Sequence, residues 1–153
     1  SMDLQMVTGD LESAIMVSTK IPEFDFPYNI EEYDKRLDES ELVLTAELDG
    51  HPVGFKVGYD RFKDGSFYSW MGGIIPNYRG RGIASNLADV QEDWAKSNEY
   101  TSIKLKTRNK HEAMIAFAID RGFDIIDSQP NDDIREMRIW MEKKLCGYKK
   151  KYH

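Results

Sequence analysis

The segment from Gly72 to Ala84 constrains the fold of this chain more than any other. Bulky residues over 67–75 predict a strand, and the turn Arg79-Gly80-Arg81-Gly82 connects it to a helix that begins near Ile83. Such a turn can direct several backbone N–H groups to one point in front of a helix N-terminus. Its two arginines add charge-assisted donors. The sequence therefore predicts an α/β fold with a site for a phosphate-bearing ligand at this turn.

Length and composition predict a single domain over residues 1–153. Ser1 before Met2 resembles a scar of tag removal, and residues from about 146 to 153 are expected to form a tail. No apolar run approaches the ~20 residues of a membrane span, and the first residues lack a secretory pattern. The single cysteine, Cys146, favours a reducing, cytoplasmic location. The net charge of −6 disfavours nucleic acid as a partner.

The periodicity of apolar residues predicts the other elements. Thr8 is predicted to cap a helix over 10–20, and Asn29 a second helix over 30–37. Alternation with period two on both sides of Asp49-Gly50 predicts a hairpin. The expected strands cover 4–7, 42–48, 53–59, 67–75, 102–107, 124–128 and 136–143, and two more helices cover 83–94 and 111–121, the last ended by Gly122. This order predicts a mixed α/β (α+β) sheet, mostly antiparallel, flanked by about four helices.

Gly72 and Gly73 interrupt the predicted strand over 67–75, where each glycine costs about 0.5–1 kcal/mol relative to alanine. One interpretation is a strand parted from its neighbour, whose N–H and C=O groups pair with an amide-bearing ligand. The other is a packing bulge beneath a Trp or Tyr side chain. The sequence leaves both interpretations open.

Three segments together resemble the GNAT superfamily of acetyl-CoA-dependent N-acetyltransferases. They are the strand end Ile74-Ile75-Pro76, the pattern Arg79-x-x-Gly82-x-Ala84, and the later Asn109 with Gly122-Phe123. The resemblance covers residues 42 to 145 and implies a sheet splayed between two central strands. It implies acetyl-CoA as co-substrate and direct transfer of acetyl to a primary amine of a small molecule or peptide. A non-catalytic acyl-CoA sensor is the alternative, and a homodimer is left open.

The same resemblance implies which residues bind coenzyme A. The turn would bind the pyrophosphate, and the pantetheine arm would run along Ile74 and Ile75. A backbone N–H of Gly73 or Ile74 would stabilise the oxyanion. His111 competes with Asn109 for the pantetheine contact. The residues expected at the cofactor are Ile74, Ile75, Arg79, Gly80, Arg81, Gly82, Ile83, Ala84, Asn109 and Phe117.

The catalytic acid departs from the pattern of the superfamily. Many members carry a tyrosine four residues before the glycine of the Gly122-Phe123 pair, where this chain has Ala118. A positioned acid contributes about 10²–10⁴-fold, and a thiol of pKa ~8.5 departs as thiolate with modest help. Activity is therefore compatible with its loss. Tyr68 is the substitute predicted, with Tyr78 as a second option, and packing is the simpler role for both.

Acidic and aromatic residues are considered for the acceptor site. Glu23, Glu31 and Trp70 are predicted to contact the acceptor, although a surface position is the simpler explanation for each carboxylate. The acceptor amine must lose a proton before it attacks, and no base is assigned. The histidines at 51, 111 and 153 predict no metal site.

Overall fold

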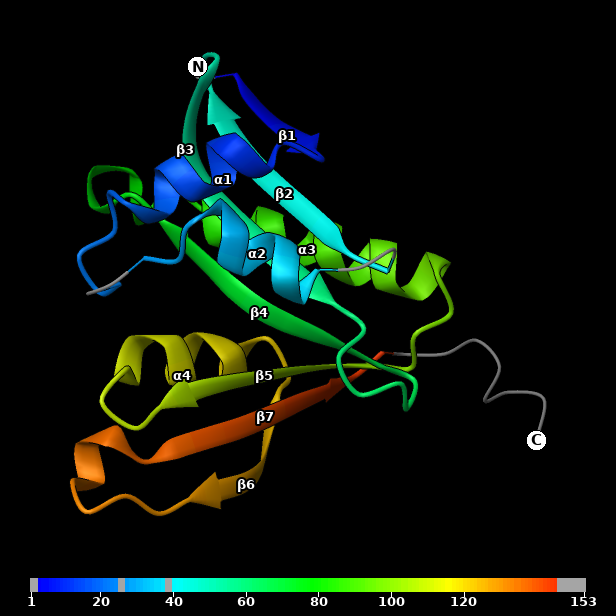
Figure 1. The fold of residues 1–153 in the computed structure, drawn as a ribbon, viewed down its shortest axis with the longest axis vertical. Helices are drawn as coiled ribbons and strands as arrows, with labels where there is room; N and C mark the ends of the chain where they lie inside the picture. Colours follow the sequence, from blue (N-terminus) through cyan, green and yellow to red (C-terminus); the bar gives the residue numbers. More distant parts are fainter. Residues whose placement is uncertain (1–2, 25–26, 38–39, 146–153) are drawn as a thin grey trace. The chain divides into compact units, whose positions relative to one another are not determined.

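The computed structural model describes residues 3–24, 27–37 and 40–145, and Figure 1 shows its ribbon. Its seven strands have the order β1-β2-β3-β4-β5-β7-β6 in one sheet. The predicted mixed α/β class with four helices is confirmed. The strands are β1 (Leu4–Thr8), β2 (Leu42–Leu48), β3 (His51–Tyr59), β4 (Ser66–Ile74), β5 (Ser102–Arg108), β6 (Asp124–Gln129) and β7 (Arg138–Lys144), and the helices are α1 (Leu11–Ser18), α2 (Ile30–Arg36), α3 (Ile83–Ser97) and α4 (Glu112–Asp120), with 3₁₀ turns η1 (Pro76–Tyr78) and η2 (Ile134–Glu136).

Strand β4 has the central place in the strand order, as its bulky residues predict. Ser66–Ser69 of β4 pair in parallel with Ser102–Leu105 of β5. The pairs β1–β2, β2–β3, β5–β7 and β6–β7 are antiparallel. The chain divides within β4 into two compact units, one of residues 1–60 with 70–94 and the other of 61–69 with 95–153. A single domain over the whole chain stays a prediction.

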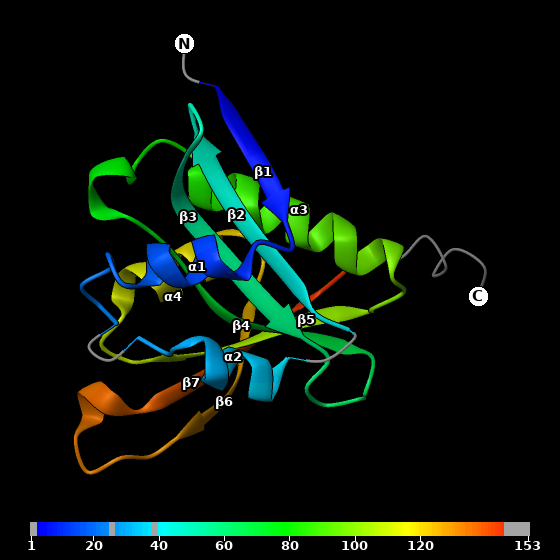
Figure 2. The same cartoon turned by 45° about the horizontal axis from the view of Figure 1, so that its top comes forward.

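In the first unit, α1 covers one face of β2 and β3, and α3 covers the other (Figures 1 and 2). Phe55 and Val57 of β3 are fully buried in the core that Ala14 and Val17 of α1 help to form. Gly54 lies on the opposite face, where a Cβ atom would lie 3.4 Å from Leu87 of α3. The alternation of side chains along β3 thus supplies one residue set to each helix layer.

The start of α1 differs from the prediction. Asp10, and not Thr8, caps the helix, because Asp10 Oδ1 accepts the Ser13 N–H at 3.0 Å. Thr8 instead ends β1, paired with Leu44 of β2. The helix spans 11–18 and is shorter than predicted. Asn29 caps α2 as predicted, with Oδ1 accepting the Glu32 N–H at 3.1 Å.

In the second unit, β5 and β7 bury one face of each strand. Ile103, Leu105 and Met141 are at most 5% exposed. The side chains on the opposite face, Lys104, Lys106 and Trp140, are half-buried. Gly122, with φ of +98°, ends the α4 segment as predicted. The strand predicted over 136–143 begins two residues later, because Glu136 belongs to η2.

The described parts of the chain contain no helix long and apolar enough to cross a bilayer. The predictions for Ser1, Cys146 and the tail concern residues outside the described ranges.

Candidate functional site

The turn between β4 and α3 leaves several backbone donors without a partner. Gly80 and Gly82 have φ of +77° and +81°, a left-handed conformation that glycine adopts readily. Among the described residues, no acceptor bonds the N–H groups of Gly80, Gly82, Ile83 or Ala84. The last two open α3, where N–H groups have no intrahelical acceptor. Such a turn suits an anion such as pyrophosphate.

Asn86 holds this turn in place. Its backbone N–H and its side-chain Nδ2 both donate to the Gly82 carbonyl oxygen, each at 3.1 Å. A Cβ atom built on Gly80 or Gly82 meets no heavy atom of the described chain within 4 Å. The carbonyl of Gly82 is therefore fixed toward the helix, and space remains around the two glycines. The sequence analysis missed Asn86, whose position four residues after Gly82 is the available signal.

Arg79 is bonded to its own chain. Its Nε donates to the Ile74 carbonyl oxygen at 3.1 Å, and its two terminal nitrogens donate to the Glu23 carboxylate at 3.0 and 2.9 Å. The Glu23 carboxylate thereby raises the pKa of Arg79. These bonds tie the end of β4 to the segment after α1. The roles of Arg79 at pyrophosphate and of Glu23 at the acceptor stay predictions.

Arg81 contributes the second cation of the turn. Its guanidinium carbon lies 5.2 Å from the centre of the Tyr78 ring, and Nη2 donates to the Asn77 carbonyl oxygen at 3.4 Å. The residue is exposed. Tyr78, which was considered as an acid, thus supports an arginine beside the unpartnered N–H groups.

Close packing accounts for the two glycines at the end of β4. A Cβ atom on Gly73 would lie 2.7 Å from Ile21 Cδ1, and one on Gly72 would lie 3.3 Å from the Phe55 carbonyl oxygen. The Ile75 N–H donates to the Val53 carbonyl oxygen at 2.9 Å, so this group is used within the unit. These contacts support the packing interpretation, with an isoleucine in place of Trp or Tyr. Gly73 and Ile74 as oxyanion donors, and Ile75 at pantetheine, stay predictions.

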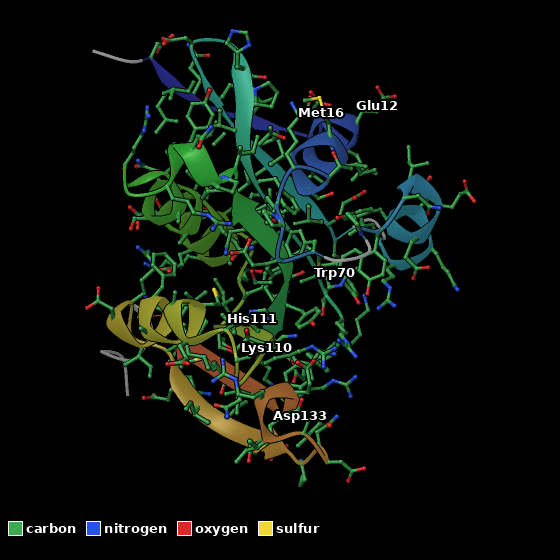
Figure 3. The ribbon with its side chains drawn as sticks, turned by 90° about the vertical axis from the view of Figure 1, so that its left-hand side faces the viewer. Glu12, Met16, Trp70, Lys110, His111 and Asp133 are labelled. Carbon is green, nitrogen blue, oxygen red and sulfur yellow. The ribbon has the colours of Figure 1, made fainter. Side chains whose placement is uncertain are left out.

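Trp70 belongs to a group of rings in the first unit and projects toward α2 (Figure 3). Its ring centre lies 4.9 Å from that of Tyr33 and 5.4 Å from that of Tyr28. The guanidinium of Arg36 lies 5.2 Å from the Trp70 ring and is paired with Glu32 at 2.8 Å. Burial raises the pKa of Tyr33 to about 12. A cation therefore already stacks on Trp70, and its contact with the acceptor stays a prediction, as does that of exposed Glu31.

The remaining predicted site residues lie in the second unit. Tyr68 is 2% exposed and packs against two rings of that unit. Asn109 Nδ2 donates to the Ile134 carbonyl oxygen at 3.2 Å, and the structure alone does not assign this side chain to a ligand. Phe117 is half-buried on α4 and His111 precedes that helix (Figure 3). Their roles stay predictions, and Ala118 is buried, with no hydroxyl at this position.

Comparison with known proteins identifies the family. Residues 12–123 match the model of the "Acetyltransferase (GNAT) family". "Acetyltransferase SG1711" of Sodalis glossinidius is 32% identical over 106 residues, which cover 67% of this chain and 72% of that protein. The chain therefore belongs to the GNAT acetyltransferase family.

Solved structures agree with this assignment. The ribosomal-protein-S18-alanine N-acetyltransferase of Escherichia coli superposes with a TM-score of 0.81 at 18% identity, covering 95% of this chain and 97% of that one. Arabidopsis thaliana Naa50, solved with the bisubstrate analogue CoA-Ac-MVNAL, has a TM-score of 0.74 at 25% identity, covering 94% and 99%. Other matched structures contain acetyl-CoA. The protein is an acetyl-CoA-dependent acyltransferase. Binding of the diphosphate of acetyl-CoA at the turn of the first unit stays a prediction.

Proposed function

We propose that this chain is an N-acetyltransferase that transfers the acetyl group of acetyl-CoA directly to a primary amine of a small molecule or peptide. One observation carries the proposal. The turn after β4 presents unpartnered N–H groups at the start of α3, beside the exposed cation of Arg81. Coenzyme A bound there through its pyrophosphate would extend its pantetheine arm along Ile74 and Ile75. The chain contributes orientation, because a bound thioester and amine react as if they were one molecule.

The protonation of the amine itself favours a peptide α-amine as the acceptor, because no base is assigned in this chain. A peptide α-amine has a pKa near 8, so about a tenth is neutral at pH 7, against fewer than a thousandth of lysine side chains. The α-amine therefore needs the least help from a base.

The likeness to Naa50 supports the same class of acceptor. That protein was solved with coenzyme A joined to a peptide, and it is 25% identical to this chain. In the proposed reaction the amine nitrogen bonds to the thioester carbon, the C–S bond breaks, and the amine proton passes to solvent. A backbone N–H of Gly73 or Ile74 would stabilise the oxyanion. The coenzyme A thiolate needs only modest assistance to depart.

The test is release of coenzyme A thiol in the presence of different amines. We expect acetyl-CoA to give thiol faster with a peptide that has an unblocked α-amine than with the same peptide blocked at its N-terminus and carrying a lysine. Mass spectrometry should place one acetyl group on the α-nitrogen. Equal rates with and without any amine of the panel would contradict the proposal.

The alternative is an acyl-CoA sensor, and Ala118 is the observation that favours it. This residue is 1% exposed and provides no hydroxyl group. A sensor would bind acetyl-CoA in calorimetry and yet show no amine-dependent release of thiol. The two measurements together separate the enzyme from the sensor.

A further inference from the structure

The turn from β1 into α1 borders a pocket of the first unit, which we call the α1–α2 pocket. Its volume is about 530 Å³, within the roughly 300–1,000 Å³ of small-molecule sites. Gly9 makes the turn with φ of +84°, and its N–H donates to the Val43 carbonyl oxygen at 3.0 Å. A Cβ atom on Gly9 would meet no heavy atom of the described chain within 4 Å. Open space therefore remains where β1 ends and β2 begins.

Apolar side chains from four elements line this pocket. Leu42 and Val43, at the start of β2, are each only 5% exposed. Leu11 of α1, Leu37 at the end of α2 and Trp94 of α3 are half-buried. A ligand with an apolar body would release water from these walls, which favours its binding. The indole of Trp94 adds a ring whose face attracts a cation.

The charged groups of the α1–α2 pocket have one sign. Asp34 of α2 and Glu41, just before β2, line it, and none of the described residues that line it is lysine, arginine or histidine. Asp34 is exposed, and its carboxylate has no hydrogen bond or ion pair with another described residue. A carboxylate binds an ammonium group through charge-assisted hydrogen bonds and repels an anion. The charge of the pocket therefore selects a cationic ligand.

The α1–α2 pocket is separate from the turn of residues 79–84. Ile83 opens α3 at that turn, and Trp94 follows about three helical turns later, which is ~16 Å along the helix axis. None of the residues predicted to bind the cofactor or the acceptor lines the pocket.

We propose that the α1–α2 pocket binds a small organic cation in which an ammonium group is joined to an apolar or aromatic body. Asp34 binds the ammonium group, and Leu11, Leu37 and Trp94 contact the body. The site goes beyond acetyl transfer, since binding there requires no acetyl-CoA. An uncharged apolar molecule is the less suitable ligand, because it leaves the Asp34 carboxylate without a partner.

The test is an NMR titration of the protein with 2-phenylethylamine, without acetyl-CoA. The indole N–H signal of Trp94, assigned with Trp94→Phe, should shift and saturate. We expect Asp34→Asn to weaken the affinity about tenfold, because it removes one charge-assisted hydrogen bond. Glu12→Gln is the matched control, since Glu12 is exposed and points outward from α1 (Figure 3), and it should change the affinity less than about twofold. Thermal unfolding confirms that each variant is folded.

Two analogues of the same size test the charge of the ligand. The neutral 2-phenylethanol should bind about tenfold more weakly than the amine, and the anionic phenylacetate should not shift the Trp94 signal. Equal affinity of Asp34→Asn and the original chain, or equal affinity for the alcohol and the amine, would overturn the proposal. An amine that shifts the Trp70 signal and leaves that of Trp94 unchanged would overturn it as well, by placing the ligand beside α2 at the aromatic rings. Because acetylation is never measured, these results are independent of the proposed enzyme activity.

Discussion

The two ends of strand β4 are built in opposite ways. At its start, Asp64 Oδ1 accepts the N–H and hydroxyl groups of Ser66, and the Gly65 carbonyl oxygen accepts the Thr101 N–H at 2.8 Å. At its end, the N–H groups around Gly82 have no acceptor in the described part of the chain. Both turns use glycines with positive φ. Glycine conformation therefore does not distinguish the two turns, whereas the unused donors at the start of a helix do.

Gly82→Glu should have the largest effect, a loss of affinity for coenzyme A. If the affinity did not change, the unused donors at the end of β4 would not form a binding site. The turn of residues 79–84 after β4 is called the exit turn. A carboxylate there repels an anionic ligand, so we expect the affinity for coenzyme A to fall more than about 100-fold. The fold should survive, because a Cβ atom meets no heavy atom within 4 Å, although the left-handed φ costs about 1–2 kcal/mol. Calorimetric titration with coenzyme A measures the loss.

Gly50→Glu is the matched control for this substitution. Gly50 has φ of +82°, and a Cβ atom there also meets nothing within 4 Å, but it lies in the β2–β3 hairpin. The backbone strain is thus the same, and the affinity for coenzyme A should be unchanged. Unaltered affinity in Gly82→Glu, or an equal loss in Gly50→Glu, would remove the turn from the site.

Gly73→Ala tests whether packing accounts for the glycine at the end of β4. The added Cβ would lie 2.7 Å from Ile21 Cδ1, so we expect a loss of about 1–3 kcal/mol in the free energy of unfolding. Ile21→Val removes that Cδ1 atom, and the double variant should regain much of the loss. Urea unfolding of the four proteins gives the coupling between the two sites. Additive effects would contradict the packing interpretation.

Local signals in the sequence predicted most of the fold. The Asp49-Gly50 turn, the cap at Asn29 and the end of the helix before Gly122 each depend on a few neighbouring residues. Alternation of side chains similarly marked β2 and β3, although most residues on both faces of these strands are buried. The exit turn was predictable for the same reason, because glycines and a helix start are adjacent in the chain.

Contacts between distant residues explain what the sequence could not predict. Arg79 and Glu23 are 56 positions apart, and only the fold brings the guanidinium to this carboxylate. Ile21 packs on Gly73 for the same reason. Asp10 caps α1 in place of Thr8, because Thr8 pairs with Leu44 as the last residue of β1. A local sequence pattern can therefore predict which residue types lie at a site, but it does not predict the distant residues that contact them.

Asp64→Asn probes the closed turn at the start of β4. Hydrogen bonds from Ser66 and Lys104 lower the pKa of Asp64 to about 2 from 3.8. Stability from this carboxylate is present above about pH 4 and is lost as the pH falls through 2. Because the side chain is 42% exposed, we expect the variant to lose less than about 1 kcal/mol at pH 7, and the difference to shrink toward pH 2. Urea unfolding across this range measures it.

Asp93→Asn, at an exposed position of α3, serves as the control for Asp64→Asn. It removes one carboxyl group to which the described structure gives no hydrogen bond, so its effect on unfolding should be small at every pH of the series. If the difference in the free energy of unfolding between Asp64→Asn and the original chain stays constant from pH 7 to pH 2, the charge of the Asp64 carboxylate does not stabilise the turn before β4.

Glu23→Gln should have the smallest effect and sharpens the role of the exit turn. The Glu23–Arg79 pair is exposed, at 47% and 43%, so its loss should lower the free energy of unfolding by less than about 1 kcal/mol. If the turn binds coenzyme A through its N–H groups, as the unpartnered donors suggest, the affinity should change less than about twofold. A tenfold gain in affinity would show that the Arg79 guanidinium, once released from Glu23, binds the phosphates itself. Arg79 would then bind either the Glu23 carboxylate or the phosphates of coenzyme A. The affinity of the exit turn would come from this side chain rather than from backbone N–H groups.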